Sequence, residues 1–241
     1  MKREITEKVR YVMDELVPPA IRDSRWFMWP FFVMAYGTFA VRPFMEFKSR
    51  AYAMTAEDYR NFYASLGNSI SRRRISDLNE ASVRFITEQL RHTSGTSLLD
   101  VGTGNGYLLS RLSGERAWRR LAGVDVVAVT GESTHFEFHE GMLPLLPFAD
   151  HEFDVVTCTH VVEHLLDVEA SIKELLRITR RQLFIVLPRQ RYYFYTLDEH
   201  LNFYPHIEPL LRLLQPHQVR HELRGGDWAI AITPAMQTAA P

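Results

Sequence analysis

The sequence predicts an α/β protein with a mostly parallel sheet and a helical segment in front of it. After residue 95, five short apolar runs alternate with helical patterns, as in sheets covered by helices on both faces. Two further runs flank Gly225-Gly226-Asp227, a hairpin signal, so we expect the sheet to finish with an antiparallel pair. Before residue 95, apolar residues recur at helical spacing.

Each expected element follows from a local pattern. Pro18-Pro19 ends the first helix, and Thr55 is suited to cap the second. We divide the chain into a helical cap (1–95), a main α/β domain (96–233) and a tail (234–241). The expected helices are 2–17, 55–66, 79–90, 108–112, 168–176 and 207–214, and the expected strands are 96–101, 121–127, 136–139, 153–157, 182–187, 219–224 and 228–233.

Composition excludes several classes of protein. The 241 residues are 46% hydrophobic and 24% charged, which is typical of a globular chain. A net charge of -1 gives no electrostatic reason to expect a nucleic-acid partner. The single cysteine, Cys158, excludes an intramolecular disulfide and a multi-cysteine zinc site. Because no secretory signal is visible, we expect a cytoplasmic protein.

The longest uncharged run is Trp26–Val41, which is rich in Trp and Phe. It is shorter than the about 20 residues of a spanning helix, and Pro30 and Gly37 interrupt it. One interpretation is a helical cap packed on the main domain. Another is that Trp26–Phe47 forms a surface that touches a membrane or a greasy substrate, so that the protein is membrane-peripheral. A homodimer interface is a further alternative.

The sharpest motif is LLDVGTGNGYLL at residues 98–109. A strand ends there, and Gly102, Gly104 and Gly106 let the backbone turn tightly and approach a ligand. A helix begins directly afterwards. Asp125 lies at the end of the next expected strand, where a carboxylate accepts hydrogen bonds from ribose hydroxyls. This arrangement predicts a nucleotide-like cofactor.

The details of the loop favour one kind of cofactor. A dinucleotide-binding site typically has the motif G-x-G-x-x-G, whereas the glycine spacing here is G-x-G-x-G. Asp100, just before the loop, would repel a pyrophosphate but suits an amino group or a positive centre. S-adenosylmethionine carries both, together with a ribose for Asp125.

The sequence resembles the class I S-adenosylmethionine-dependent methyltransferases, in the small-molecule branch with the methyltransferase type 11 pattern. The matching motifs are DVGTGNG (100–106), GVD ending at Asp125, LPFADHEFDVV (146–156) and Glu163-His164. The resemblance covers residues 96–233 and implies a Rossmann-like seven-stranded sheet with an antiparallel C-terminal hairpin. The cofactor-binding residues it implies are Asp100, Gly102, Thr103, Gly104, Asn105, Gly106, Asp125, Val126, Gly141, Met142, Leu143 and Thr159.

The chain also departs from the family pattern. Met142 stands where an Asp often holds the adenine amino group, so we expect backbone groups and apolar packing, or Glu140, to do so. The segment between Asp125 and Gly141 is short, and we expect a turn or a loop with Gly131 in it rather than a full helix.

Methyl transfer is an in-line displacement, to which positioning contributes most. The resemblance places the loop after the fourth strand beside the methyl group. His160 is the first candidate there for a base or a substrate orienter, with pocket lining as the alternative. His164 is a second candidate; the alternative is that it begins the next helix and simply caps or packs there. His160, Glu163, His164 and His200 also raise the alternative of a divalent ion, although our expectation is no metal; the H-x-x-E-H letters alone do not make a zinc peptidase.

Rings and donors gather in residues 189–204, after the fifth strand. We expect this segment to bind the acceptor through Arg191, Tyr193, Tyr195 and His200, while other rings pack on helix 207–214. Tyr63 and Arg72–Arg74 are candidates to close over the cofactor.

The function expected is methyl transfer to a small or medium-sized acceptor, such as a sugar, a lipid-linked intermediate or a natural product, on oxygen rather than carbon or nitrogen. The family's nucleic-acid and protein members often carry an Asn/Asp-Pro-Pro-Tyr/Phe turn after the fourth strand, where this chain has THVV. A partner subunit that binds S-adenosylmethionine without turnover, or a membrane-peripheral assembly protein, remains the alternative.

Overall fold

The computed structural model describes residues 12–38, 41–65, 76–127 and 136–235. The chain forms two compact units: Met1–Arg74 with Gln190–Pro205, and Ile75–Arg189 with His206–Pro241. This division differs from the boundary at residue 95 that the sequence suggested. Helix α7 (Glu80–Leu90) belongs to the second unit because its apolar face joins that unit's core, and residues 190–205 belong to the first.

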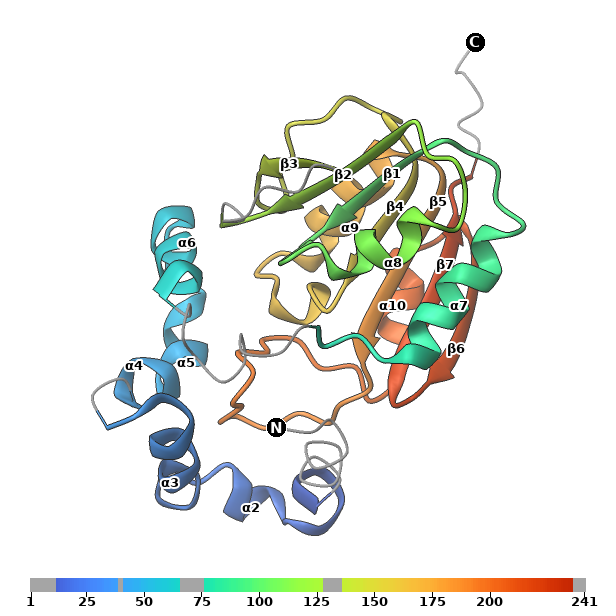
Figure 1. Cartoon of the computed structure of the whole chain (residues 1–241). Helices are drawn as coiled ribbons and strands as arrows, with labels where there is room; N and C mark the ends of the chain where they lie inside the picture. The colour runs from blue at the N-terminus through green and yellow to red at the C-terminus, as the bar shows by residue number, and fades with distance from the viewer. Residues whose placement is uncertain (1–11, 39–40, 66–75, 128–135, 236–241) are drawn as a thin grey trace. The chain divides into compact units, whose positions relative to one another are not determined.

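The second unit is built on one seven-stranded sheet with the order β3-β2-β1-β4-β5-β7-β6 (Figure 1). Neighbours from β3 to β5 pair in parallel, whereas β7 pairs antiparallel with both β5 and β6. The predicted mostly parallel sheet with a C-terminal antiparallel hairpin is therefore confirmed. The strands are β1 (Ser97–Val101), β2 (Arg120–Asp125), β3 (Glu137–Glu140), β4 (Phe153–Thr159), β5 (Thr179–Pro188), β6 (Gln218–Arg224) and β7 (Asp227–Thr233).

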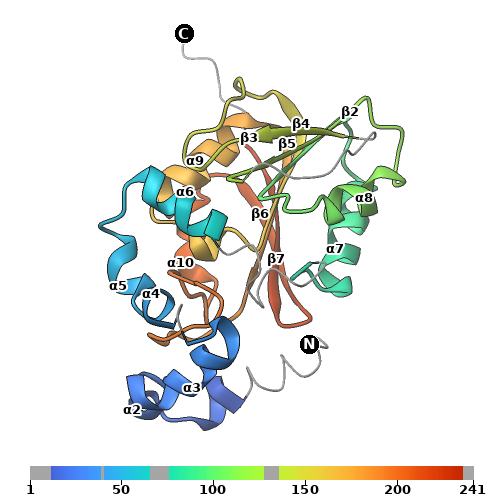
Figure 2. The ribbon, with the colours of Figure 1, turned by 60° about the vertical axis from the view of Figure 1, so that its left-hand side comes forward.

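Helices cover both faces of this sheet. Helix α7 and helix α8 (Tyr107–Ser113) lie on one face, and α9 (Val168–Ile178) and α10 (Glu208–Leu213) lie on the other (Figures 1 and 2). Strands β4 and β5 are buried along nearly their whole length, which explains their continuous apolar runs. The parallel strands β1, β2, β4 and β5 thus bring their carboxyl ends to one edge of a buried sheet.

The first unit is helical over its described residues up to Ser65. Helix α3 (Arg25–Tyr36) continues through Pro30 and ends at Gly37, whose φ of 78° suits a residue without Cβ. Thr55 caps the helix α6 as predicted, since its hydroxyl accepts from the Asp58 N–H at 3.1 Å. Residues 2–11 of the expected first helix lie outside the described residues. The other elements are η1 (Val12–Leu16), α2 (Pro19–Arg22), α4 (Val41–Met45), α5 (Phe47–Ala51) and α6 (Ala56–Ser65).

Polar contacts tie residues 190–205 to these helices. Asp23 accepts a hydrogen bond from the Phe194 N–H at 2.6 Å, and Lys48 Nζ donates to the Tyr193 carbonyl at 2.8 Å. These bonds fix the segment by its backbone, which explains why it belongs to the first unit. No helix among the described residues has the length and apolar character needed to cross a bilayer.

Candidate functional site

The loop between β1 and α8 is built by its three glycines. Gly102, Gly104 and Gly106 have φ values of 74°, 53° and 77°, in the left-handed region that side chains disfavour. The Gly102 N–H donates to the Val124 carbonyl at 2.8 Å, which ties the loop to β2. A Cβ on Gly102 would lie 2.1 Å from Val161 Cγ2, so the loop packs tightly against the segment after β4.

Asp125, the last residue of β2, holds the same loop from its other side. Its Oδ2 accepts a hydrogen bond from the Gly104 N–H at 2.8 Å, and its Oδ1 accepts from the Val127 N–H at 3.4 Å. Nothing lies within 4 Å of the position that a Cβ on Gly104 would take. The carboxylate is half-buried, and the loop backbone beside it borders open space.

Asp100 lies beneath the loop with 2% of its surface exposed. Burial raises its pKa to about 7, and the charge of Asp125 acts in the same direction, whereas hydrogen bonds from the Thr157 and Thr103 hydroxyls oppose the shift. The Thr157 hydroxyl donates to Asp100 Oδ1 at 2.7 Å. A nearby positive charge would favour ionised Asp100.

These residues fit the cofactor that the sequence predicts. The site has two carboxylates, Asp100 and Asp125. Residues 100–110 contain no Lys or Arg, so the loop offers no positive charge to neutralise a pyrophosphate. It offers carboxylate oxygens for a ribose and a negative charge for an amino or sulfonium group. Open space beside Gly104 leaves room for a ligand to approach the backbone.

The remaining predicted cofactor residues lie at the same strand ends or in the loop. Val126 follows β2 and Thr159 ends β4, and both residues are half-buried. Met142 is half-buried, whereas Leu143 is only 8% exposed and joins the core. An adenine site at this turn therefore has Met142 as its more accessible side chain. Thr103 is buried, Asn105 caps the Tyr107 N–H, and Gly141 donates to the Asp125 carbonyl.

His160 follows β4 and lies between two buried carboxylates. Its Nδ1 is 3.3 Å from Glu163 Oε1 and its Nε2 is 3.4 Å from Asp227 Oδ2. Burial alone would lower its pKa, but the contacts with Asp227 and Glu163 outweigh burial and raise the pKa to about 10. The ring is therefore an imidazolium at neutral pH, with both nitrogens facing carboxylates, and this does not suit a general base.

The backbone of His160 is strained and pinned. Its φ is 54°, a left-handed conformation that costs a residue with a Cβ about 1–2 kcal/mol. Its N–H donates to the Val186 carbonyl of β5 at 2.8 Å. Strain of this kind persists only where neighbouring contacts hold it, and it often accompanies functional sites.

Asp227, which its sequence context marks only as a turn residue, lies beside His160. It begins β7 opposite Pro188 at the end of β5, so the hairpin delivers a carboxylate to the edge where the parallel strands end. Asn79 Nδ2 donates to Asp227 Oδ2 at 2.7 Å, while Asn79 Oδ1 caps α7 by accepting from the Ser82 N–H at 2.8 Å. Only the pairing of β5 with β7 reveals this role.

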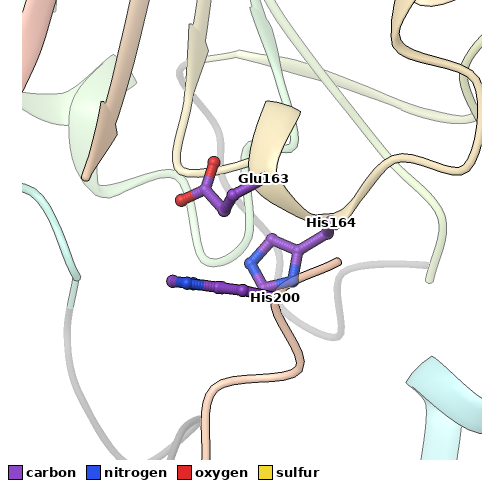
Figure 3. A group of neighbouring side chains, drawn as sticks. All are labelled: Glu163, His164 and His200. Atoms are coloured by element: carbon purple, nitrogen blue, oxygen red, sulfur yellow. The ribbon is translucent and has the colours of Figure 1, made fainter. Parts of the chain in front are cut away.

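Glu163 and His164 lie on η4 (Val162–His164), the short 3-10 helix after β4 (Figure 3). The Glu163 side chain is buried, and His164 is half-buried. The expectation that His164 begins the next helix is wrong, because α9 starts at Val168 with Asp167 as its cap. His200, also labelled in Figure 3, belongs to the other unit, and the divalent ion stays the untested alternative to the expectation of no metal.

The predicted acceptor residues all lie in the first unit, and most are engaged there. His200 Nδ1 is 2.6 Å from Gln190 Oε1, and Gln190 Nε2 donates to the Tyr193 hydroxyl at 3.0 Å. Tyr195 packs edge-on against Phe32 of α3. Arg191 is exposed. Within this unit Tyr193, Tyr195 and His200 thus have structural contacts, and Arg191 presents its side chain to the surface.

Two other expectations have no structural outcome. Arg72–Arg74 and the segment with Gly131 lie outside the described residues. Tyr63 lies on α6, where its hydroxyl is 3.2 Å from the Tyr59 hydroxyl and its ring packs on Tyr59 and Phe47.

Comparison with known proteins identifies the same region. Residues 99–187 match the family model described as a methyltransferase domain. The chain is 28% identical over 134 residues to an uncharacterized methyltransferase of Bacillus subtilis, YcgJ, covering 51% of this chain and 50% of that protein. It is 30% identical over 98 residues to a demethylmenaquinone methyltransferase of Mycolicibacterium vanbaalenii, covering 40% and 43%.

The fold has solved counterparts. The crystal structure of an S-adenosylmethionine-dependent methyltransferase from Aquifex aeolicus is similar with a TM-score of 0.51 at 16% identity, over 73% of this chain and 98% of that one. The chain spans about half the length of the curated relatives it matches. Residues 99–187 thus match a methyltransferase domain, and the fold of the chain is similar to that of a solved S-adenosylmethionine-dependent methyltransferase.

Proposed function

We propose that this protein transfers a methyl group from S-adenosylmethionine to a small or medium-sized acceptor, on oxygen rather than carbon or nitrogen. The observation that carries the proposal is the contact between Asp125 and the Gly104 N–H at 2.8 Å, beside a glycine loop that borders open space. It places a carboxylate at the edge where parallel sheets of this kind bind ligands.

The cofactor supplies an electrophilic methyl group on a sulfonium, and the residues of the chain supply its binding site. Asp125 would accept hydrogen bonds from the ribose hydroxyls, and Asp100 would favour the positively charged end. Met142 would pack against the adenine, since it is more accessible than Leu143. Gly104 would let the ligand approach the loop backbone, because a side chain there would fill that space.

His160 is proposed as a positioning residue rather than a base. Its two nitrogens already face Glu163 and Asp227, so it has no lone pair with which to take a proton from an acceptor at neutral pH. It would fix the turn after β4 and the Glu163 carboxylate. His164 remains the candidate for proton transfer, because it is half-buried beside Glu163 and follows the same strand.

The acceptor is proposed to be a hydroxyl compound with apolar surface. The aromatic segment 190–205 supports this proposal, with Arg191 as its exposed cation. One relative is named for demethylmenaquinone, which supports an apolar acceptor, although the match covers 43% of that protein. Arg191, Tyr193, Tyr195 and His200 stay the proposed acceptor residues, the last three through the contacts that hold the segment.

The cofactor site is tested by calorimetric titration with S-adenosylhomocysteine. In Asp125→Asn the amide oxygen can still accept from the Gly104 N–H. An NH2 group replaces the second oxygen and cannot accept a hydrogen bond from a ribose hydroxyl. We expect binding to weaken at least tenfold, a loss of about 1.4 kcal/mol. Asp150→Asn, an exposed carboxylate in a surface pair with Arg177, is the matched control and should bind as wild type does. Equal binding by both variants, or NAD binding as tightly, would contradict the proposal.

Two alternatives keep specific outcomes. A partner subunit without turnover would bind S-adenosylhomocysteine, and Asp125→Asn would weaken that binding. It would not convert S-adenosylmethionine to S-adenosylhomocysteine when given acceptors that a catalytic relative methylates. Peripheral membrane contact through Trp26–Phe47 is proposed on the exposed side chains of Trp26 and Met34. A homodimer through the same segment would give twice the monomer mass in solution.

A further inference from the structure

An apolar stripe runs along the exposed side of α3. Trp26, Pro30 and Met34 are four residues apart, so they lie on one face of the helix. Trp26 is 74% exposed and Met34 is 72% exposed. The opposite face carries Met28 and Phe32, which are buried against α4. One side of α3 therefore anchors the helix in its unit, and the other presents large apolar side chains to the surroundings.

The lack of charge is specific to the part of the sequence that carries the stripe. From Trp26 to Val41 no residue is charged, whereas the chain as a whole is 24% charged. A helix that is apolar on all sides is ordinarily buried in a core or in lipid. Helix α3 is neither wholly buried nor long enough to span a bilayer, because its 12 residues extend only about 18 Å. This length and exposure suit a helix that lies in the plane of a membrane surface.

The charges that lie near the stripe in the sequence favour one kind of membrane. Residues 20–50 carry five basic side chains against two acidic ones, a net charge of +3 in a chain whose total is -1. Arg25, Arg42 and Arg50 are exposed. Arg25 is paired with Glu46 at 3.5 Å, whereas Arg42 and Arg50 are the exposed cations outside that pair. The positive charge of these exposed arginines complements anionic headgroups.

Pro30 favours a hydrated lipid headgroup region over a dry protein interface as the partner of the stripe. Because proline has no N–H, the carbonyl of Trp26 has no donor at its usual i+4 position. A dry protein partner would bury that carbonyl at a cost, whereas the headgroup region hydrates it. Trp26 itself is suited to this region, since its ring is apolar and its indole N–H needs a polar partner.

We infer that the Trp26–Pro30–Met34 stripe of α3 inserts into the headgroup region of an anionic phospholipid bilayer, with Arg42 and Arg50 bound electrostatically to the lipid phosphates. The inference does not depend on the proposed methyl transfer. It concerns how the first unit binds to a membrane, in which an apolar acceptor would be dissolved.

The test is co-sedimentation of the full chain with vesicles of phosphatidylcholine alone and of phosphatidylcholine with phosphatidylglycerol at three to one. We expect wild type to bind the anionic vesicles at least tenfold more tightly than the neutral ones, and to be released by salt. The double variant Trp26→Asp/Met34→Asp should bind at least tenfold more weakly than wild type. The control is Leu145→Asp, since Leu145 is an 81% exposed apolar residue of the other unit, and it should bind as wild type does.

Circular dichroism and S-adenosylhomocysteine titration check that each variant is folded, so failed folding and failed docking are distinguishable. A second variant, Arg42→Gln, keeps the apolar stripe and should weaken binding to the anionic vesicles only. The inference is overturned if wild type and the double variant sediment equally. It is also overturned if wild type is a dimer by light scattering and the double substitution makes it a monomer, because the stripe then serves a second copy of the chain.

Discussion

His160 Nε2 lies 3.4 Å from Asp227 Oδ2, and this contact joins the end of β4 to the start of β7. The two residues are 67 positions apart in the sequence and meet because β7 pairs with β5, beside β4. Asn79 extends the contact to the first turn of α7. A candidate site at the sheet edge is thus held by a buried polar network rather than by the loop after β4 alone.

Removing the Asp227 charge should lower the pKa of His160. In Asp227→Asn the imidazolium loses one of its two carboxylate partners while the shape of the side chain is kept. We expect the titration midpoint of the His160 ring to fall from about 10 by about 1 to 3 pH units. Nuclear magnetic resonance of ring-labelled histidine measures it directly. Asp150→Asn serves as the control, and an unchanged midpoint in Asp227→Asn would show that the ion pair does not hold the proton.

The same pair predicts how stability depends on pH. The pKa of His160 is raised above its unfolded value of about 6.5, so the stability from its charged state is fully present below about 6.5 and is lost as pH rises through about 10. We expect the free energy of unfolding of wild type to fall between pH 7 and 10 more steeply than that of Asp227→Asn. Urea denaturation at several pH values measures this difference. Parallel curves for the two proteins would be evidence against the raised pKa.

Asp100 should couple cofactor binding to proton release. Burial raises its pKa to about 7, and a bound positive centre would favour its ionised form. We therefore expect S-adenosylmethionine to bind more tightly as pH rises from 6 to 8, with release of a proton near pH 6.5. Calorimetry in two buffers of different ionisation enthalpy counts that proton. Asp100→Asn should abolish the release, and a wild type that releases none would contradict the placement of charge.

Gly104→Ala should impair binding much more than folding. Its φ of 53° makes a Cβ unfavourable by about 1–2 kcal/mol, yet no neighbour lies within 4 Å of that Cβ. The added methyl group would instead occupy the space proposed for the ligand. We expect a loss of stability of about 1–2 kcal/mol and at least a hundredfold loss in S-adenosylhomocysteine affinity. Gly114→Ala, at an open helix end with ordinary φ, is the control. Equal affinities would place the ligand elsewhere.

Asn79→Ala should destabilise the protein more than the loss of an ordinary helix cap. Loss of a cap costs about 1 kcal/mol, and this substitution also removes a donor to the buried Asp227 carboxylate. Asp167→Ala is the matched comparison, because Asp167 caps α9 on the exposed side through the Ala170 N–H. We expect Asn79→Ala to be the more costly by about 1–3 kcal/mol in chemical denaturation. Equal costs would mean that Asp227 needs no donor from α7.

Much of the fold was predictable because its signals are local. The continuous apolar runs of β4 and β5, the cap at Thr55 and the turn at Gly225-Gly226 each specify an element within a few residues. Gly102–Gly106 and Asp125 were predictable for the same reason, since one motif places them at adjacent strand ends.

The rest depends on contacts between distant residues. Asp227 looked like a turn residue until the pairing of β7 with β5 placed it beside His160. His160 was a candidate for a base or a substrate orienter because its unperturbed pKa lies near neutrality. The sequence could not show that the carboxylates of Glu163 and Asp227 raise that pKa. The acceptor role of Tyr193 and Tyr195 stays a prediction. The sequence could not show the hydrogen bonds and ring contacts that tie their segment to the N-terminal helices.

The central claim, that the edge formed by Gly104 and Asp125 holds S-adenosylmethionine, is tested most directly by a crystal structure of the full chain grown with S-adenosylhomocysteine. The account predicts ribose hydroxyls within hydrogen-bonding distance of the Asp125 carboxylate and the nucleoside over the Gly102–Gly106 loop. A nucleoside bound at another edge of the sheet, or a ribose that Asp125 does not touch, would contradict it.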